Sequence, residues 1–128
     1  MAFRAAVDEA LRPQELNLRQ VGVLASLKRS PGQSNADLAR GASTTPQSMV
    51  EVLRGLEGAG LVERRPDPAG GRALQAELTP FGAAALGAGR AIIAQTESRL
   101  LADLTSAERS ELRRLLERAL VSVQTDGA

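Results

Sequence analysis

The sequence predicts a mainly α-helical fold of the α+β class, with one two-stranded β-hairpin between helices. Three observations lead to this prediction. Apolar residues recur at helical spacing over most of the chain. The dipeptide Thr-Pro occurs twice, directly before such segments, where threonine can cap a helix and proline can begin it. Between residues 61 and 79 the pattern changes to alternation on either side of a turn rich in proline and glycine, which is typical of a hairpin.

Three short helices are expected in the first third of the chain. Residues 2–11 form the first, which Pro13 ends, and residues 18–29 form the second. The third begins at Ser34, because a serine with Asp37 three residues later resembles a capping box. The sequence SPGQ separates the second helix from the third. These helices account for residues up to about the Gly-Ala pair at 41–42.

A fourth helix and the hairpin complete the central part. Thr45 is a suitable N-cap and Pro46 a suitable first helical residue. The apolar stripe of this helix consists of Met49, Val52, Leu53 and Leu56. Residues 61–65 and 73–79 are the two strands. A short helix, a tight turn and a capped second helix make a helix-turn-helix, and the hairpin that follows makes it a winged helix-turn-helix.

Two longer helices are expected after the hairpin. One runs from Pro80 to about Leu101, and the other starts at a capping box formed by Thr105 and Glu108. The residues expected to form a dimer interface are Leu100, Leu112, Leu115, Leu116 and Leu120. The alternative is that these helices pack only on their own domain. We expect a single domain over residues 1–128, with a head at 16–79, helical dimerisation segments at 1–15 and 80–123, and a tail at 124–128.

The composition argues against most enzyme chemistry. The chain has no Cys, His, Trp or Tyr, so it lacks the usual parts of thiol sensors, Cys or His metal clusters and Ser-His-Asp triads. We expect no enzymatic activity, no metal and no cofactor, and a cytoplasmic protein without a signal peptide or membrane span. The net charge is only +1, with a balance of +2 in residues 16–80. Charge alone therefore does not identify a nucleic-acid binder.

Three segments resemble the MarR family of bacterial transcription regulators. SNADLARGASTTPQSMVEVLRGLEGAGLVERRPDP is similar to that family's helix-turn-helix and first wing strand. GRALQAELTPFGAAAL resembles its second wing strand and the following helix, and LTSAERSELRRLLERAL its last helix. The resemblance covers roughly residues 10 to 122. It implies a homodimeric regulator, usually a repressor, that binds a pseudo-palindromic operator in double-stranded DNA and is often released by a small, frequently aromatic effector.

The resemblance also implies which residues contact DNA. In the fourth helix, Gln47 suits adenine, Val50 suits a thymine methyl, and Glu51 either accepts from cytosine or orients a neighbour. Arg72 corresponds to the arginine that enters the minor groove from the wing tip, although Gly70 stands where the family often has an acid. The full candidate set is Ser34, Asn35, Thr44, Thr45, Pro46, Gln47, Ser48, Val50, Glu51, Arg54, Arg64, Arg65 and Arg72.

Two further points follow from the same sequence. Since the chain has no His, Tyr or Trp, an effector pocket would consist of aliphatic side chains, Ser, Thr, Gln and Arg. The rival hypothesis is a winged-helix module that docks a protein partner through Val50 and the neighbouring apolar surface, without specific DNA binding. The nearly neutral charge is the observation that favours this alternative.

Overall fold

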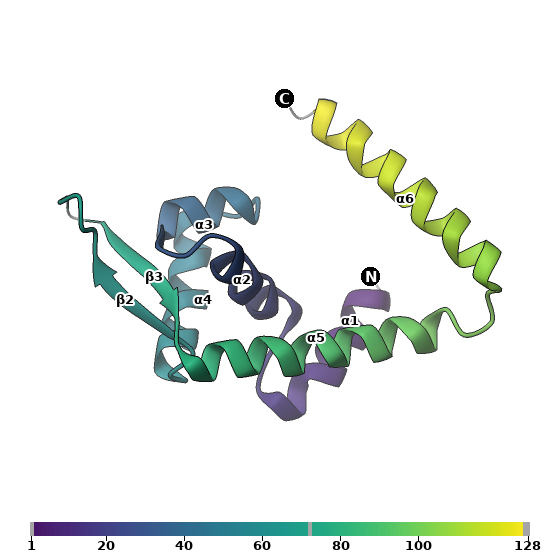
Figure 1. The fold of residues 1–128 in the computed structure, drawn as a ribbon, viewed down its shortest axis with the longest axis horizontal. Helices are drawn as coiled ribbons and strands as arrows, with labels where there is room; N and C mark the ends of the chain where they lie inside the picture. Colours follow the sequence, from purple (N-terminus) through teal and green to yellow (C-terminus); the bar gives the residue numbers. More distant parts are fainter. Residues whose placement is uncertain (1, 72, 127–128) are drawn as a thin grey trace. The chain divides into compact units, whose positions relative to one another are not determined.

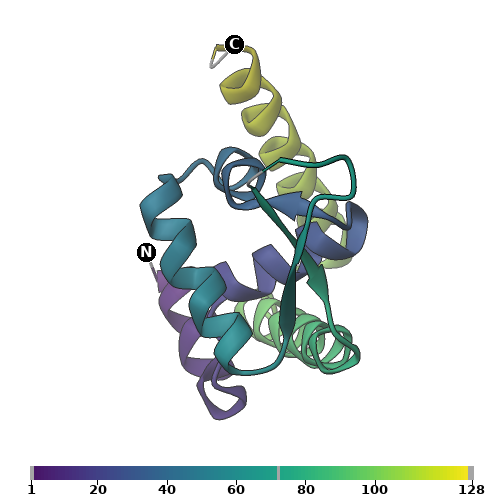
Figure 2. The same ribbon diagram turned by 90° about the vertical axis from the view of Figure 1, so that its left-hand side faces the viewer.

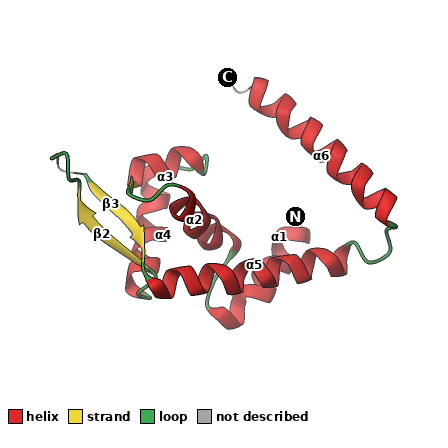
Figure 3. Ribbon diagram, in the orientation of Figure 1, coloured by secondary structure: helices red, strands yellow, loops and turns green. Residues whose placement is uncertain are grey.

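The structure is a computed structural model that describes residues 2–71 and 73–126. It confirms the predicted fold class, because helices dominate and the predicted hairpin after the fourth of them belongs to a small antiparallel sheet (Figures 1 and 3). The chain forms two compact units, Met1–Ala94 and Gln95–Ala128. The first unit contains the helix-turn-helix and the sheet. The boundary lies inside a long helix, α5, which spans Pro80–Leu100.

The first helices of unit 1 are α1 (Ala2–Leu11), the short 3-10 helix η1 (Arg12–Gln14) and α2 (Leu18–Arg29). Pro13 lies in η1, directly after α1 ends, as the sequence predicts. α2 begins with a full capping box that the sequence analysis did not identify. The Asn17 side chain accepts from the backbone N–H of Gln20, and the Gln20 side chain accepts from the backbone N–H of Asn17.

The helix-turn-helix consists of α3 (Asn35–Gly41) and α4 (Pro46–Gly58). The predicted capping box of α3 is present, since Ser34 and Asp37 exchange hydrogen bonds between backbone N–H groups and side-chain oxygens at 3.1 Å each. α4 begins as predicted, with Thr45 as N-cap and Pro46 as the first residue. In the turn, Ser43 adopts a positive φ of 51°. The sequence signals therefore place both helix starts correctly.

The sheet has one more strand than the two-stranded hairpin predicted from the sequence. β2 (Val62–Pro66) and β3 (Leu74–Leu78) are the antiparallel wing strands, with Val62 opposite Leu78. A third strand, β1 (Gln33–Ser34), pairs with the other edge of β3, which gives the strand order β1-β3-β2. β1 has only two residues, so it is too short to show the alternation by which strands are recognised in a sequence.

One apolar core holds unit 1 together. It is formed by residues of the four helices, the wing strands and the first half of α5. Its buried members are Val7, Leu11, Leu16, Val21, Val23, Leu24, Leu27, Leu38, Ala39, Met49, Leu53, Leu56, Val62, Ala76 and Leu86. Of the predicted α4 stripe, Met49, Leu53 and Leu56 are buried and Val52 is half-buried. The core therefore fixes which face of α4 points outward.

The start of α5 is held by Thr79 and by a close backbone approach. The Thr79 hydroxyl donates to the Gly60 carbonyl at 2.6 Å and accepts from the Gly82 N–H at 3.0 Å, while the Thr79 N–H donates to the Leu61 carbonyl at 3.1 Å. A Cβ atom at Gly82 would lie 2.0 Å from the Leu61 carbonyl oxygen. Gly82 lowers helix propensity but lets α5 lie against the end of the wing.

Unit 2 contains the end of α5 and helix α6 (Ser106–Asp126). The predicted capping box opens α6, because Thr105 and Glu108 exchange hydrogen bonds at 2.8 and 3.1 Å. The Arg109 guanidinium donates to the Leu101 carbonyl at 2.9 and 3.1 Å and so ties α6 to the turn before it. None of the helices in the described residues combines the length and apolar composition needed to span a bilayer.

Candidate DNA-binding surface

The outward face of α4 is polar and accessible. Gln47, Ser48, Glu51 and Arg54 are exposed, whereas Val50 is half-buried. Within the described residues, Gln47, Glu51 and Arg54 take part in no hydrogen bond or ion pair, so their polar groups are free to bind a ligand. α4 lies beside the β2–β3 hairpin, and Figure 2 shows both on the face of unit 1 that is turned toward the viewer.

The beginning of α4 is fixed by two side chains from outside the helix. The Thr45 hydroxyl accepts from the Ser48 N–H at 3.1 Å and donates to the Ser48 hydroxyl at 2.9 Å. The Asn35 amide donates to the Pro46 carbonyl at 2.9 Å, which links the start of α3 to the start of α4. Asn35 is thus occupied in positioning α4, a role that the sequence analysis did not predict. In the first turn of α4, Pro46 has no N–H and the Ser48 N–H is capped by Thr45, which leaves the N–H of Gln47 for an anion.

The wing arginines have carboxylate partners. Arg64 lies 3.7 Å from Glu57 of α4 and its side chain is only 21% exposed. Arg65 pairs with Glu63 at 2.9 Å and with Glu77 at 3.5 Å across the sheet. The hydrogen bond to Glu63 raises the pKa of Arg65 above its ordinary value, so Arg65 stays fully charged. Both arginines are predicted candidates for phosphate contact. In the structure Arg64 also links β2 to α4, and Arg65 links β2 to β3.

The tip of the wing turns around Asp67. The Asp67 carboxylate accepts from the Ala69 N–H at 2.8 Å, and its backbone carbonyl accepts from the Gly70 N–H at 3.0 Å. Gly70 and Gly71 have φ angles of 88° and 112°, a conformation that L side chains rarely adopt. An acid at position 70 would be strained there, which explains a glycine at this position. Arg72 lies outside the described residues.

The predicted dimerisation residues lie in unit 2 and are largely exposed in the single chain. Leu100, Leu115 and Leu116 are 52%, 47% and 55% exposed, and Leu112 is half-buried. The side chain of Leu120 lies outside the described residues. Leu112, Leu115 and Leu116 follow one another at i, i+3 and i+4, so they share one face of α6. Leu115 and Leu116 thus leave part of this apolar face of α6 exposed in the single chain.

Two contacts at this surface could not be predicted from patterns in the sequence. The bond from Asn35 to Pro46 joins residues eleven positions apart, and the ion pair of Arg64 with Glu57 depends on how the wing packs on α4. The described residues contain no group of three or more His, Cys, Asp or Glu side chains placed to hold a metal ion.

The fold and this surface define a winged helix-turn-helix protein. A model of the MarR family matches residues 16–74, which include α2 to the start of β3. The HTH-type transcriptional repressor Rv2887 of Mycobacterium tuberculosis (strain H37Rv) is 44% identical over 116 residues, which are 91% of this chain and 84% of that protein. The chain belongs to the MarR family.

Solved structures show the same relationship. The Mycobacterium tuberculosis MarR family protein Rv2887 in complex with DNA has a TM-score of 0.79 and 40% identity, with coverage of 91% of this chain and 87% of that one. Its complex with salicylic acid has a TM-score of 0.75 and 42% identity, covering 92% and 87%. The apo form of wild-type MarR from E. coli has a TM-score of 0.84 at 27% identity, covering 93% and 89%.

Proposed function

We propose that this chain is a sequence-specific DNA-binding transcriptional repressor that acts as a homodimer and is released by a small-molecule effector. The observation that carries the proposal is the exposed polar face of α4, which is held at its start by Thr45 and Asn35 and lies beside a wing. A relative that is 40% identical over nearly its whole length is solved in complex with DNA, and supports the same role here.

In this mechanism α4 enters the major groove and the wing approaches the neighbouring minor groove. The first residues of such a helix contact bases, so the side chains of Gln47, Val50 and Glu51 are proposed to read the operator, and the backbone N–H of Gln47 to bind phosphate. Two heads of a dimer then contact half-sites about 34–36 Å apart. The other proposed contacts are those of Ser34, Asn35, Thr44, Ser48, Arg54, Arg64 and Arg65.

The effector acts on this arrangement by favouring dimers whose heads do not fit the operator. Complexes of the relative Rv2887 with salicylic acid and p-aminosalicylic acid support a small aromatic acid as the kind of effector to test first. We place the protein in the cytoplasm, since a repressor works where the chromosome lies. Its proposed action is binding alone, without chemistry on DNA or effector.

A salt series tests the function directly. The protein is mixed with DNA from upstream of its own gene, and the binding constant is measured by gel shift at several salt concentrations. We expect log K to fall linearly with log salt, because bound phosphates release counterions. Scrambled DNA of the same length is the control. Absent or salt-independent binding to both DNAs would favour a protein-docking module instead, and equal salt-dependent affinity for both would contradict sequence-specific recognition.

The wing tip provides a separate prediction. We expect Arg72→Ala to weaken operator binding by about 1–3 kcal/mol, because the minor groove loses one inserted guanidinium. Arg12→Gln is the control, since Arg12 is 74% exposed and belongs to η1 and not to α4 or the wing. Gel shifts at one salt concentration compare the three proteins. If Arg72→Ala binds as tightly as the unchanged protein, Arg72 has no role in the minor groove.

A further inference from the structure

Nearly every carboxylate of the helix-turn-helix and the wing has a partner within the chain. Between the start of β1 and the end of β3 the acidic residues are Asp37, Glu51, Glu57, Glu63, Asp67 and Glu77. Arginines pair with four of them, as Arg40–Asp37, Arg64–Glu57, Arg65–Glu63 and Arg65–Glu77. The Asp67 carboxylate accepts from the Ala69 N–H. Glu51 is the exception, since it has no partner among residues 2–71 and 73–126.

Glu51 lies on the exposed face of α4, about one helical turn after Gln47. Arg54, three residues further along this helix, is also exposed and forms no ion pair with Glu51. The sequence leaves two roles open for Glu51, and the orientation of a neighbouring side chain is not seen in the described part of the chain. The carboxylate is therefore available to a group outside the protein.

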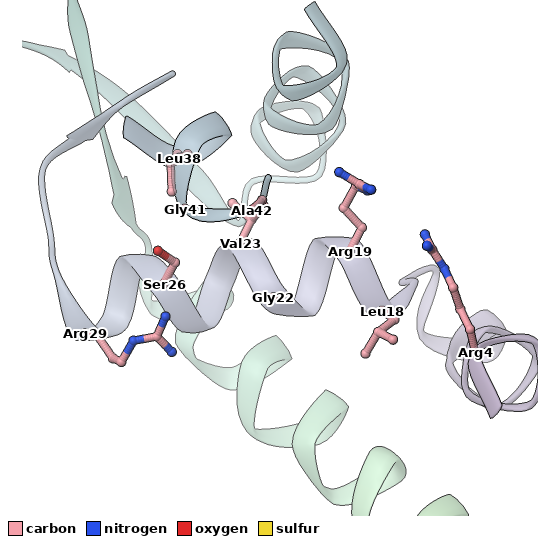
Figure 4. A pocket seen from close by; sticks show the side chains of 10 residues that line it. All are labelled: Arg4, Leu18, Arg19, Gly22, Val23, Ser26, Arg29, Leu38, Gly41 and Ala42. Atoms are coloured by element: carbon pink, nitrogen blue, oxygen red, sulfur yellow. The ribbon is translucent and has the colours of Figure 1, made fainter. Parts of the chain in front are cut away.

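The direction in which Glu51 leaves α4 is fixed by packing. Met49 and Leu53, two residues before and two after it, are fully buried in the core. α4 packs on α3, and α3 lies on α2, where Leu38 of α3 and Val23 of α2 are buried and line one small pocket (Figure 4). Because α4 cannot turn about its axis without exposing this core, Glu51 stays on the outward face.

A carboxylate can only accept hydrogen bonds, and this decides which base it can contact in the major groove. Guanine presents the acceptors N7 and O6, and thymine presents the acceptor O4, so both repel a carboxylate. Cytosine presents its N4 amino group, which is a donor. Adenine presents an amino group too, but with the acceptor N7 beside it. The expected order of preference is cytosine, then adenine, with thymine and guanine last.

We propose that Glu51 is a specificity-determining residue that requires a cytosine in each operator half-site and rejects guanine at that position. The inference rests on the proposed function, because it needs α4 in the major groove. Phosphate contact does not account for Glu51, since a carboxylate and a phosphate repel each other. On DNA without a donor at this place Glu51 weakens binding, so one side chain both favours the operator and disfavours other DNA.

The spacing of Gln47 and Glu51 places this cytosine relative to a second base. The two residues are four positions apart, which is about 6 Å along a helix axis, and successive bases are about 3.4 Å apart along DNA. The Gln47 amide suits adenine, with which it can form two hydrogen bonds. Each half-site is therefore expected to contain an adenine and a cytosine within about two base-pair steps of each other.

A base-by-base replacement series on the operator tests the inference. The DNA is the shortest upstream fragment that the unchanged full-length protein binds in preference to scrambled DNA. Each base pair is replaced in turn by the three others, and dissociation constants are measured by fluorescence anisotropy at one salt concentration. We expect one C·G pair in each half-site whose replacement by G·C weakens binding by at least about 10-fold.

Two variants assign that base pair to Glu51. Glu51→Ala is expected to bind all four base pairs at this position equally, to within about 3-fold, and to bind scrambled DNA more tightly because a negative charge is lost. Glu51→Gln is expected to prefer adenine there, since an amide can pair with N6 and N7 together. Glu117→Gln is the control, because it loses the same charge on an exposed position of α6. It should keep the preference for cytosine.

The outcomes separate this inference from the proposed function. If the unchanged protein binds scrambled and upstream DNA equally, or binds neither, both are wrong. If it binds the operator specifically and Glu51→Ala keeps every base preference, the inference is overturned and the proposed function stands. An equal loss of preference at all positions in Glu51→Ala also overturns it, since that result indicates a structural role. Loss of preference at one base pair, with a change to adenine in Glu51→Gln, supports it.

Discussion

Gly82→Ala is expected to lower the free energy of unfolding by about 3 kcal/mol, which is a large effect for the addition of one methyl group. The added Cβ would lie 2.0 Å from the Leu61 carbonyl oxygen and 3.2 Å from a methyl carbon of Leu78. The first contact is with backbone, so no side chain can rotate to relieve it. The same carbonyl accepts from the Thr79 N–H, and pushing it away weakens the start of α5.

The control for this prediction lies five residues along the same helix. A Cβ at Gly87 would meet no described atom within 4 Å, so Gly87→Ala should raise the free energy of unfolding by about 0.5–1 kcal/mol through helix propensity alone. Urea unfolding followed by circular dichroism measures both, at one protomer concentration because dimer stability depends on concentration. The packing explanation is wrong if the two substitutions shift stability in the same direction.

The double variant Leu115→Glu/Leu116→Glu is expected to be monomeric at micromolar concentration and to bind the operator about 100-fold more weakly. Both leucines are about half exposed in the single chain. Glutamate at these positions would have to lose its water when two chains meet, which strongly opposes association. A monomer has one head, so it loses the gain in affinity that linking two heads provides. Sedimentation velocity and gel shift measure the two effects.

Arg113→Glu is the matched control for the dimer variant. It also lowers the net charge by two and places a glutamate on an exposed position of α6. We expect it to remain dimeric, with only the loss of DNA affinity that the charge change causes in both proteins. A double leucine variant that stays dimeric would show that the interface lies elsewhere, for instance around α1 and its exposed Phe3.

Local signals in the sequence were sufficient for most of the fold. Thr45 with Pro46 and Thr105 with Glu108 act within one helical turn, and the structure shows each as predicted. β1 was missed because two residues have no periodicity, and its pairing with β3 spans about forty residues of chain. The closeness of Gly82 to the Leu61 carbonyl could not be predicted either, because it arises only when the start of α5 packs on the end of the wing.

The exposed face of the candidate site was predictable from the sequence, but the ion-pair partners of its arginines were not. The exposure of Gln47, Glu51 and Arg54 follows from the apolar stripe on the opposite side of α4. Which arginines would be paired could not be predicted, because the distances of Arg64 and Arg65 to their carboxylates depend on the tertiary packing and on strand register.

The ion pairs of the wing have a consequence for how such a repressor is distributed on a chromosome. Arg64 and Arg65 each have glutamates beside them, so phosphates along any stretch of DNA must compete with carboxylates that are already in place. Attraction to phosphates, which is independent of sequence, is therefore weakened more than attraction through the base contacts that we propose for α4. Fewer copies are then held at the very numerous non-operator sites, and a small number of molecules per cell is enough to keep one operator occupied.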